Sequence, residues 1–168
     1  VRFDVMFKKG FDFVRGGKMP GLFGGKGNTG GNKPTGRDGF SARMMWREDG
    51  RAVQYLYYPD QPTRYGHQIP WIDQATGQPI RFIPGQWHTV VHRVCMNAPG
   101  KRDGTLQAFF DNQPVLKMDS IRFRDTDAFA IDGFLLSTFF GGGDASWETT
   151  AQETIYFDNF QIIKIAFE

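Results

Sequence analysis

Four side chains able to bind an anion recur at alternate positions of the segment 40–59, FSARMMWREDGRAVQYLYYP. Ser41 and Arg43 precede a Glu-Asp-Gly turn, and Tyr55 and Tyr57 follow it. An arginine fork pairs with a carboxylate or phosphate through two parallel hydrogen bonds, and hydroxyl groups donate and accept further ones. These residue types predict a site for an anionic, hydroxyl-rich ligand on an open sheet face.

The spacing of these four side chains predicts a β-hairpin that brings them together. Apolar and polar residues alternate in the first arm, which is the period of a half-buried strand. A three-residue turn with Gly50 in the left-handed conformation pairs Arg43 with Tyr55 and Ser41 with Tyr57, all on one face. A slip of one residue would scatter them, so the hypothesis depends on this register.

One reaction fits these residue types without a pair of carboxylates, namely β-elimination of a uronic acid polymer. An arginine neutralises the sugar carboxylate and so acidifies the C5 proton; a base removes that proton, and an acid protonates the departing O4. A lysine or tyrosine near a cation has a lowered pKa and suits the base. The set would be Lys18, Ser41, Arg43, Tyr55 and Tyr57. We predict that Arg43 with Ser41 binds the carboxylate, that Tyr57 or Lys18 takes the proton, and that Tyr55 is the acid.

The sequence supports a metal site or a glycosidase less well than it supports β-elimination. The histidines are His67, His88 and His92. His88 and His92 share one face of a predicted strand about 13 Å apart, too far for joint coordination at ~2 Å, and we expect them at the surface or in a groove. No paired-acid motif of a glycosidase is present. The elimination requires no cofactor. A structural calcium remains open for acidic residues expected at turns and strand ends, which are Asp111, Asp132, Asp144 and Asp158.

Composition favours a single all-β domain over residues 1–168. The 21 glycines, 9 prolines and 17 phenylalanines are typical of many short strands joined by turns. No apolar run approaches the ~20 residues that span a bilayer. Residues 1–51 carry 11 Lys and Arg against 5 Asp and Glu, a balance of +6. That field favours a polyanion, and nucleic acid, acidic polysaccharide and anionic membrane all fit it, as does a merely solvated basic surface.

The elements expected around the hairpin are strands and loops in alternation. Residues 16–39 and 60–86 are predicted to be long loops because glycine or proline recurs through them. The predicted strands are residues 1–7, 87–97 (with Cys95 as a small apolar residue), a hairpin turning at residues 111–113, a buried strand 134–140, and 155–167. An antiparallel β-sandwich or jelly roll accommodates them, with a concave face that holds an extended polymer.

Several motifs, in this order, resemble polysaccharide lyase family 14, the alginate lyases and related polyuronate lyases. They are GGKMPGLFGG (16–25), SAR (41–43), YLYYP (55–59), GQWHTVVHRV (85–94), STFFGGG (137–143) and IYFDNFQI (155–162). The resemblance implies a two-sheet jelly roll with a cleft on its concave face. It also implies the catalytic set Lys18, Ser41, Arg43, Tyr55 and Tyr57.

The same resemblance implies an activity and a partner. The activity is β-elimination that leaves unsaturated uronate ends, with alginate as the leading substrate. The partner is an anionic polysaccharide rather than nucleic acid or membrane, and the protein is expected to be a secreted monomer. Family domains usually carry residues before the strand 1–7, so a truncated N-terminus is an open alternative.

Two other functions stay open at this point. The glucuronan lyases are also jelly rolls with similar strand motifs, and the uronic acids differ only in stereochemistry. A noncatalytic carbohydrate-binding module would use aromatic platforms instead of proton transfer. The tryptophans available for such platforms are Trp46, Trp71, Trp87 and Trp147, although Trp46 falls on the predicted core face.

Overall fold

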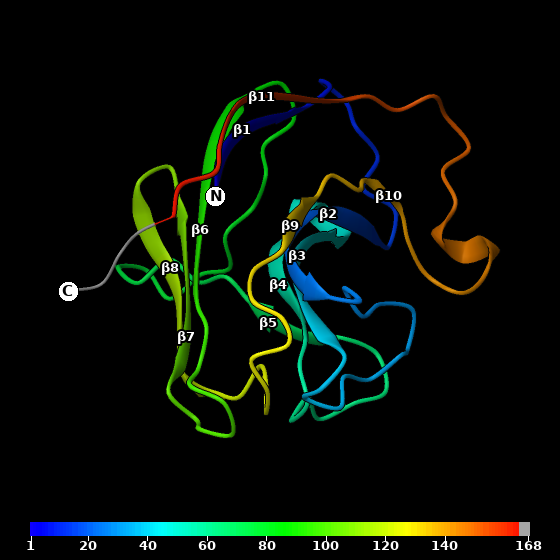
Figure 1. Ribbon diagram of the computed structural model, residues 1–168. Coiled ribbons are helices and arrows are strands. Elements are labelled where there is room, and N and C mark those ends of the chain that lie inside the picture. Colours follow the sequence, from blue (N-terminus) through cyan, green and yellow to red (C-terminus); the bar gives the residue numbers. More distant parts are fainter. Residues whose placement is uncertain (165–168) are drawn as a thin grey trace.

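Two antiparallel sheets face each other in the computed structural model, which describes residues 1–164 (Figure 1). The first sheet has the order β11-β1-β6-β7-β8. Its strands are β1 (Arg2–Phe7), β6 (Trp87–Cys95), β7 (Gly104–Phe110), β8 (Gln113–Ile121) and β11 (Ile155–Gln161). The expected all-β sandwich is confirmed.

The second sheet has the order β10-β2-β3-β4-β5, and β9 also pairs with β2. Its strands are β2 (Gly16–Gly25), β3 (Gly39–Arg47), β4 (Ala52–Tyr57), β5 (His67–Pro70), β9 (Gly133–Leu135) and β10 (Phe139–Phe140). Two short 3-10 helices, Glu48–Gly50 and Ala145–Trp147, complete the described elements. Within residues 1–164, no helix has the length and apolar character needed to cross a membrane.

Alternating apolar side chains from both sheets form the core between them. Phe3, Val5 and Phe7 of β1 are fully buried, as is Trp46 of β3. The rings of Phe7 and Trp46 lie 5.5 Å apart, edge to face, and so connect the two sheets. Burial of each such side chain contributes about 1.5–3 kcal/mol, which fixes β3 with one face toward the core. The other face of β3 is left for the polar residues.

The predicted hairpin is confirmed in register. Ser41 lies opposite Tyr57, and Arg43 lies opposite Tyr55. Gly50 has a φ of 72° and therefore adopts the left-handed conformation expected at the turn. The four predicted side chains consequently share one face of the β3–β4 pair.

The predicted long loop over residues 16–39 is wrong in its first half, which forms β2. Glycine is used there because neighbouring backbone lies too close for a side chain. A Cβ on Gly21 would lie 2.1 Å from the carbonyl oxygen of Ala42 on β3. The glycines of β2 thus serve close packing between strands, and only residues 26–38 form a loop.

The later strands are confirmed in part. Residues 87–95 and 113–121 are strands, and the turn at Asp111 and Asn112 has positive φ at both residues, as in a type I′ hairpin. The buried strand predicted at 134–140 is wrong, because it breaks into β9 and β10. Leu136 between them is 62% exposed. The last strand ends at Gln161, and residues 165–167 of that prediction lie outside the described residues.

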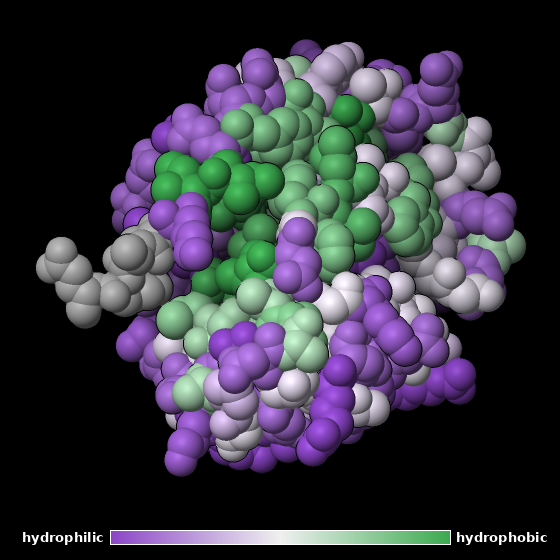
Figure 2. All heavy atoms as spheres, viewed as in Figure 1, coloured by the Kyte–Doolittle hydropathy of each residue, from purple (hydrophilic) through white to green (hydrophobic). Residues whose placement is uncertain are grey.

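Apolar side chains also gather in a band on one face of the molecule (Figure 2). The exposed large apolar residues toward the end of the described chain include Leu136, Tyr156, Phe160, Ile162 and Ile163. Leu136 directly follows β9, Tyr156 and Phe160 lie in β11, and Ile162 and Ile163 follow β11. The polar site described below lies instead on the β2–β3–β4 surface.

Candidate active site

The five predicted residues meet on three neighbouring strands of the second sheet. Lys18 lies on β2 opposite Met45, which shares its face of β3 with Arg43. The Nζ of Lys18 lies 4.3 Å from the centre of the Tyr55 ring, and the Cζ of Arg43 lies 5.7 Å from it. The hydroxyls of Tyr55 and Tyr57 are 3.4 Å apart. The structure therefore brings the predicted lysine, arginine and tyrosines together.

This polar face is covered rather than open, so the expected exposure is wrong. Ser41 and Tyr57 are fully buried, while Arg43 and Tyr55 are 4% and 5% exposed. Lys18 is half-buried. The residues that cover the sheet come from segments outside the hairpin, which strand alternation cannot reveal.

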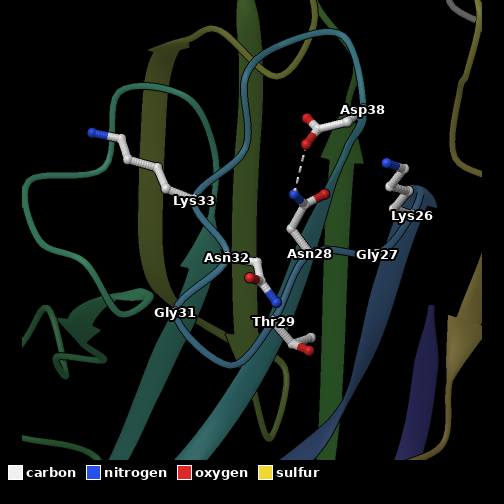
Figure 3. Close-up of a pocket in the computed structure, with 8 residues that line it drawn as sticks. All are labelled: Lys26, Gly27, Asn28, Thr29, Gly31, Asn32, Lys33 and Asp38. Atoms are coloured by element: carbon white, nitrogen blue, oxygen red, sulfur yellow. Dashed lines mark hydrogen bonds between the residues drawn. The ribbon is translucent and has the colours of Figure 1, made fainter.

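The loop 26–38 forms one part of the cover. The Ser41 hydroxyl donates to the carbonyl oxygen of Asn28 at 2.7 Å, and the Gly31 N–H donates to the Tyr57 hydroxyl at 3.0 Å. The same loop surrounds a cavity of about 520 Å³ (Figure 3), in which the Asn28 amide donates to Asp38 at 3.1 Å. The loop thus holds Ser41 and Tyr57 through its backbone, and its cavity is lined by none of the five predicted residues.

Gly66 and Trp147 form the rest of the cover. A Cβ at Gly66 would meet the rings of Tyr57 and Tyr55 at 2.6 and 2.9 Å, so this backbone packs directly on both phenols. Trp147 packs against the cluster that contains Met45 and both tyrosines. A second cavity, of about 320 Å³, lies beside Trp147.

The site holds buried positive charge without an acidic partner. Burial, together with the nearby positive charges of Arg43 and Arg47, lowers the pKa of Lys18 to about 8. Burial also lowers the pKa of Arg43, although the two phenols oppose that effect. Among the described residues, neither Lys18 nor Arg43 forms an ion pair with a carboxylate, and the Nε of Arg43 is buried without a hydrogen-bond partner.

The environment of Tyr55 favours its protonated form. Burial raises the pKa of this phenol, and its hydrogen bond with Tyr57 raises it further. A phenol that keeps its proton near neutral pH can donate it to a leaving oxygen. Lys18 and Tyr55 therefore have opposite tendencies, one toward losing its proton and one toward keeping it. Such divergence marks an acid–base pair.

Three neighbours of the site are not among the five predicted site residues, although Trp147 is one of the tryptophans considered as a sugar platform. The Lys18 ammonium contacts the sulfur of Met45 at 3.2 Å, and Arg47 follows Met45 on the same face of β3. The period-two pattern could have indicated both, since they continue the row of Ser41 and Arg43. Trp147 lies about a hundred positions further along the chain, and no local signal connects it with the hairpin.

Two of the histidines, His88 and His92, are buried rather than at the surface or in a groove as expected, whereas His67 is half-buried. His88 is 5% exposed, accepts from the Ile83 N–H at 3.0 Å and bonds Asp111 at 2.8 Å. His92 is fully buried between the sheets, and its Nε2 lies 2.7 Å from the Gln54 side-chain oxygen. Over residues 1–164, no group of three His, Cys, Asp or Glu side chains is arranged to hold a metal ion.

Two of the tryptophans considered as sugar platforms are inaccessible. Trp46 and Trp71 are fully buried. Trp87 is half exposed but lies on β6, in the other sheet. Only Trp147 adjoins the polar face, where guanidinium groups already contact its ring.

Three alginate lyase structures resemble this fold over 94% of the chain. They are alginate lyase Aly36B (TM-score 0.81, 32% identity), the PL-14 alginate lyase from Aplysia kurodai (0.76, 30%) and alginate lyase vAL-1 from Chlorella virus (0.73, 28%). The chain spans 65%, 66% and 66% of their respective lengths. Structures of Aly36B variants contain alginate trisaccharide or tetrasaccharide.

A more distant structure and a family model complete the comparison. The endo-beta-1,4-glucuronan lyase from the fungus Trichoderma reesei has a TM-score of 0.58 at 14% identity and shares the fold alone. A search of curated proteins found no match. Residues 1–160 match the family described as polysaccharide lyase 14. The match covers nearly the whole chain, and the chain belongs to the polysaccharide lyase 14 family.

Proposed function

We propose that this protein cleaves an acidic uronate polymer, with alginate as its substrate, by β-elimination. The observation that carries the proposal is that two desolvated cations, Lys18 and Arg43, lie beside two phenols. Among the described residues, neither cation has an acidic partner. Burying cations costs free energy, and an anionic ligand offsets that cost. The alginate bound to variants of the related Aly36B supports this choice of polymer.

The proposed reaction assigns one role to each group. Arg43, positioned beside Ser41, pairs with the substrate carboxylate and makes the adjacent C5 proton more acidic. Neutral Lys18 removes that proton, and the electron pair forms the C4–C5 double bond. The bond from C4 to O4 breaks, and Tyr55 donates its proton to the departing O4. One product then carries an unsaturated uronate end, and solvent restores the protons of the free enzyme.

Tyr57 is the alternative base, because its hydroxyl lies next to Tyr55 and receives the Gly31 N–H. We favour Lys18 because its pKa of about 8 leaves a useful neutral fraction near neutral pH. Lys18 is also half-buried, whereas Tyr57 is fully buried, so a polymer reaches Lys18 first. Movement of the covering segments must accompany access to Arg43.

The proposed steps use side chains of this chain alone, and a single copy carries all of them. Both points favour a monomer that acts without a cofactor. Alginate is a bulky polymer outside cells, and we propose that the protein works there.

Incubation with alginate tests the proposal directly. We expect ultraviolet absorbance to rise as double bonds conjugated with carboxylates accumulate, and Arg43→Ala to abolish the rise while the protein stays folded by circular dichroism. A parallel incubation with glucuronan identifies a glucuronan lyase if only that polymer is cleaved. Binding of alginate without any absorbance change would overturn the lyase assignment in favour of a binding module.

A further inference from the structure

The side chains next to the proposed catalytic group form a row of cations that becomes more buried toward Arg43. Arg15 is exposed, Arg47 and Lys18 are half-buried, and Arg43 is buried. Arg47 lies four residues from Arg43 on one face of β3, about 13 Å along the strand. The catalytic step described above uses Arg43 and Lys18, and it leaves Arg15 and Arg47 without a role.

Trp147 holds both of these arginines. Their guanidinium carbons lie 5.2 Å (Arg15) and 5.0 Å (Arg47) from its ring. The Arg15 Nη1 also donates to the Ser146 hydroxyl at 2.6 Å. Trp147 itself packs on Gly142, where a Cβ would lie 2.0 Å from the indole, so the ring has little freedom to shift. Two guanidinium groups are thereby held in place before any ligand arrives.

Arg47 forms no ion pair with a carboxylate among the described residues. Its Nη1 is buried without a hydrogen-bond partner among the described residues. The adjacent Glu48 instead pairs with Arg51 at 3.5 Å. Asp144, near Arg15, accepts from the Ser146 N–H at 2.9 Å. Glu48 and Asp144 therefore each have another partner, and a planar guanidinium with an unpartnered donor is suited to binding a carboxylate.

We infer that Arg47, with Arg15 and held by Trp147, forms a second carboxylate-binding subsite for another uronate of the same polymer. The inference rests on the proposed function and names a further substrate contact for it. A polyuronate carries one carboxylate on each sugar, so it would meet Arg43 and Arg47 at the same time. Contact at the exposed end of the row would also guide the chain toward the buried catalytic arginine.

The subsite predicts that binding depends on oligomer length through Arg47. We expect Arg47→Ala to weaken binding of a mannuronate hexasaccharide by about tenfold. The same change should have little effect on binding of the shortest mannuronate oligomer that the wild-type protein still binds. On alginate, KM should rise by about tenfold with kcat nearly unchanged when each variant is assayed on its own pH plateau. Arg47→Lys should restore only part of the affinity, because lysine keeps the positive charge but cannot form the second hydrogen bond of the arginine fork.

Arg51→Ala is the matched control, since it removes one positive charge from the same hairpin at a side chain already paired with Glu48. Isothermal titration of each variant with both oligomers, alongside thermal melts, measures the effect independently of turnover. If Arg47→Ala and Arg51→Ala change both affinities equally while wild-type cleavage of alginate persists, the subsite is refuted and the proposed function stands. If wild-type protein neither binds nor cleaves alginate, both are refuted.

Discussion

The proposed role of Lys18 as the base makes the pH dependence of cleavage a quantitative test. With a pKa of about 8, the amine is neutral in about 9% of molecules at pH 7, half at pH 8 and about 90% at pH 9. Because kcat/KM follows the ionisation of the free enzyme, it should rise about tenfold from pH 7 to pH 9. An ordinary lysine, titrating near 10.4, would remain mostly charged over that range.

The positive charges near Lys18 should also set the midpoint of this pH profile. Burial is the main cause of the lowered pKa of Lys18, and Arg43 and Arg47 add to it. Arg47→Ala removes one positive neighbour, so the pKa of Lys18 should rise and the midpoint of the profile should shift to higher pH. Arg51→Ala is the control, because Arg51 is not among the causes of that shift. Initial rates at low alginate concentration, followed by ultraviolet absorbance, measure both.

Substitution of the base itself completes this test. Lys18→Arg retains a positive charge but cannot lose its proton, so kcat should fall by about 10²–10⁴-fold while alginate binding persists. A flat wild-type profile between pH 7 and pH 9 would refute the assignment. So would substantial cleavage by Lys18→Arg, and in that case Tyr57 would become the base.

Three further predictions concern the arginine fork, the buried histidine and the packed glycine. Arg43→Lys should lower kcat/KM by about 10²-fold or more in the absorbance assay, since a point charge cannot replace bidentate pairing; unchanged activity would contradict carboxylate binding there. Burial lowers the pKa of His92 from 6.5 to about 3, so the unfolded chain binds a proton that the folded chain excludes. This contribution to stability is therefore kept above pH 6.5 and falls toward pH 3 by up to roughly 1.4 kcal/mol per pH unit. In His92→Gln, the free energy of unfolding measured with urea should depend less steeply on pH over that range. Gly21→Ala should cost about 2 kcal/mol or more in thermal or urea unfolding, because its Cβ would lie 2.1 Å from the Ala42 carbonyl oxygen; a wild-type midpoint would contradict that packing.

The hairpin could be predicted from sequence because each signal was local. The alternation of apolar and polar residues set the faces, and the Glu-Asp-Gly turn fixed the register that pairs Arg43 with Tyr55. The face and the register of a hairpin residue are determined by residues close to it in sequence. Local alternation likewise predicts β6 and the β7–β8 hairpin where the structure has them.

The cover over the site could not be predicted in this way. Ser41 and Tyr57 are buried by backbone groups of Asn28 and Gly31, and the tyrosines also by Gly66. These contacts involve glycine and main chain, which carry almost no side-chain signal. Glycine itself is ambiguous, since it serves mobile loops and also strands whose neighbours approach closely. That ambiguity explains why β2 was predicted as a loop.

The error over β2 concerns the most important residue of the proposed mechanism. A lysine in a mobile loop would have no defined distance to Arg43 or Tyr55, whereas a paired strand fixes it. Pairing alone is not sufficient, however. Lys18 and Gly21 are three positions apart, so in a regular strand they would lie on opposite faces.

A bulge between Met19 and Gly21 changes this alternation, since Pro20 is the additional residue of β2. Because of the bulge, Lys18 lies opposite Met45 and Gly21 lies opposite Arg43, both on the polar face, while Met19 is fully buried. Proline is tolerated at a bulge because the ladder there needs no N–H donor. If β2 had no bulge and Gly21 still lay opposite Arg43, the side chain of Lys18 would point into the core. One irregular residue thus determines that the base and the carboxylate-binding arginine share a face.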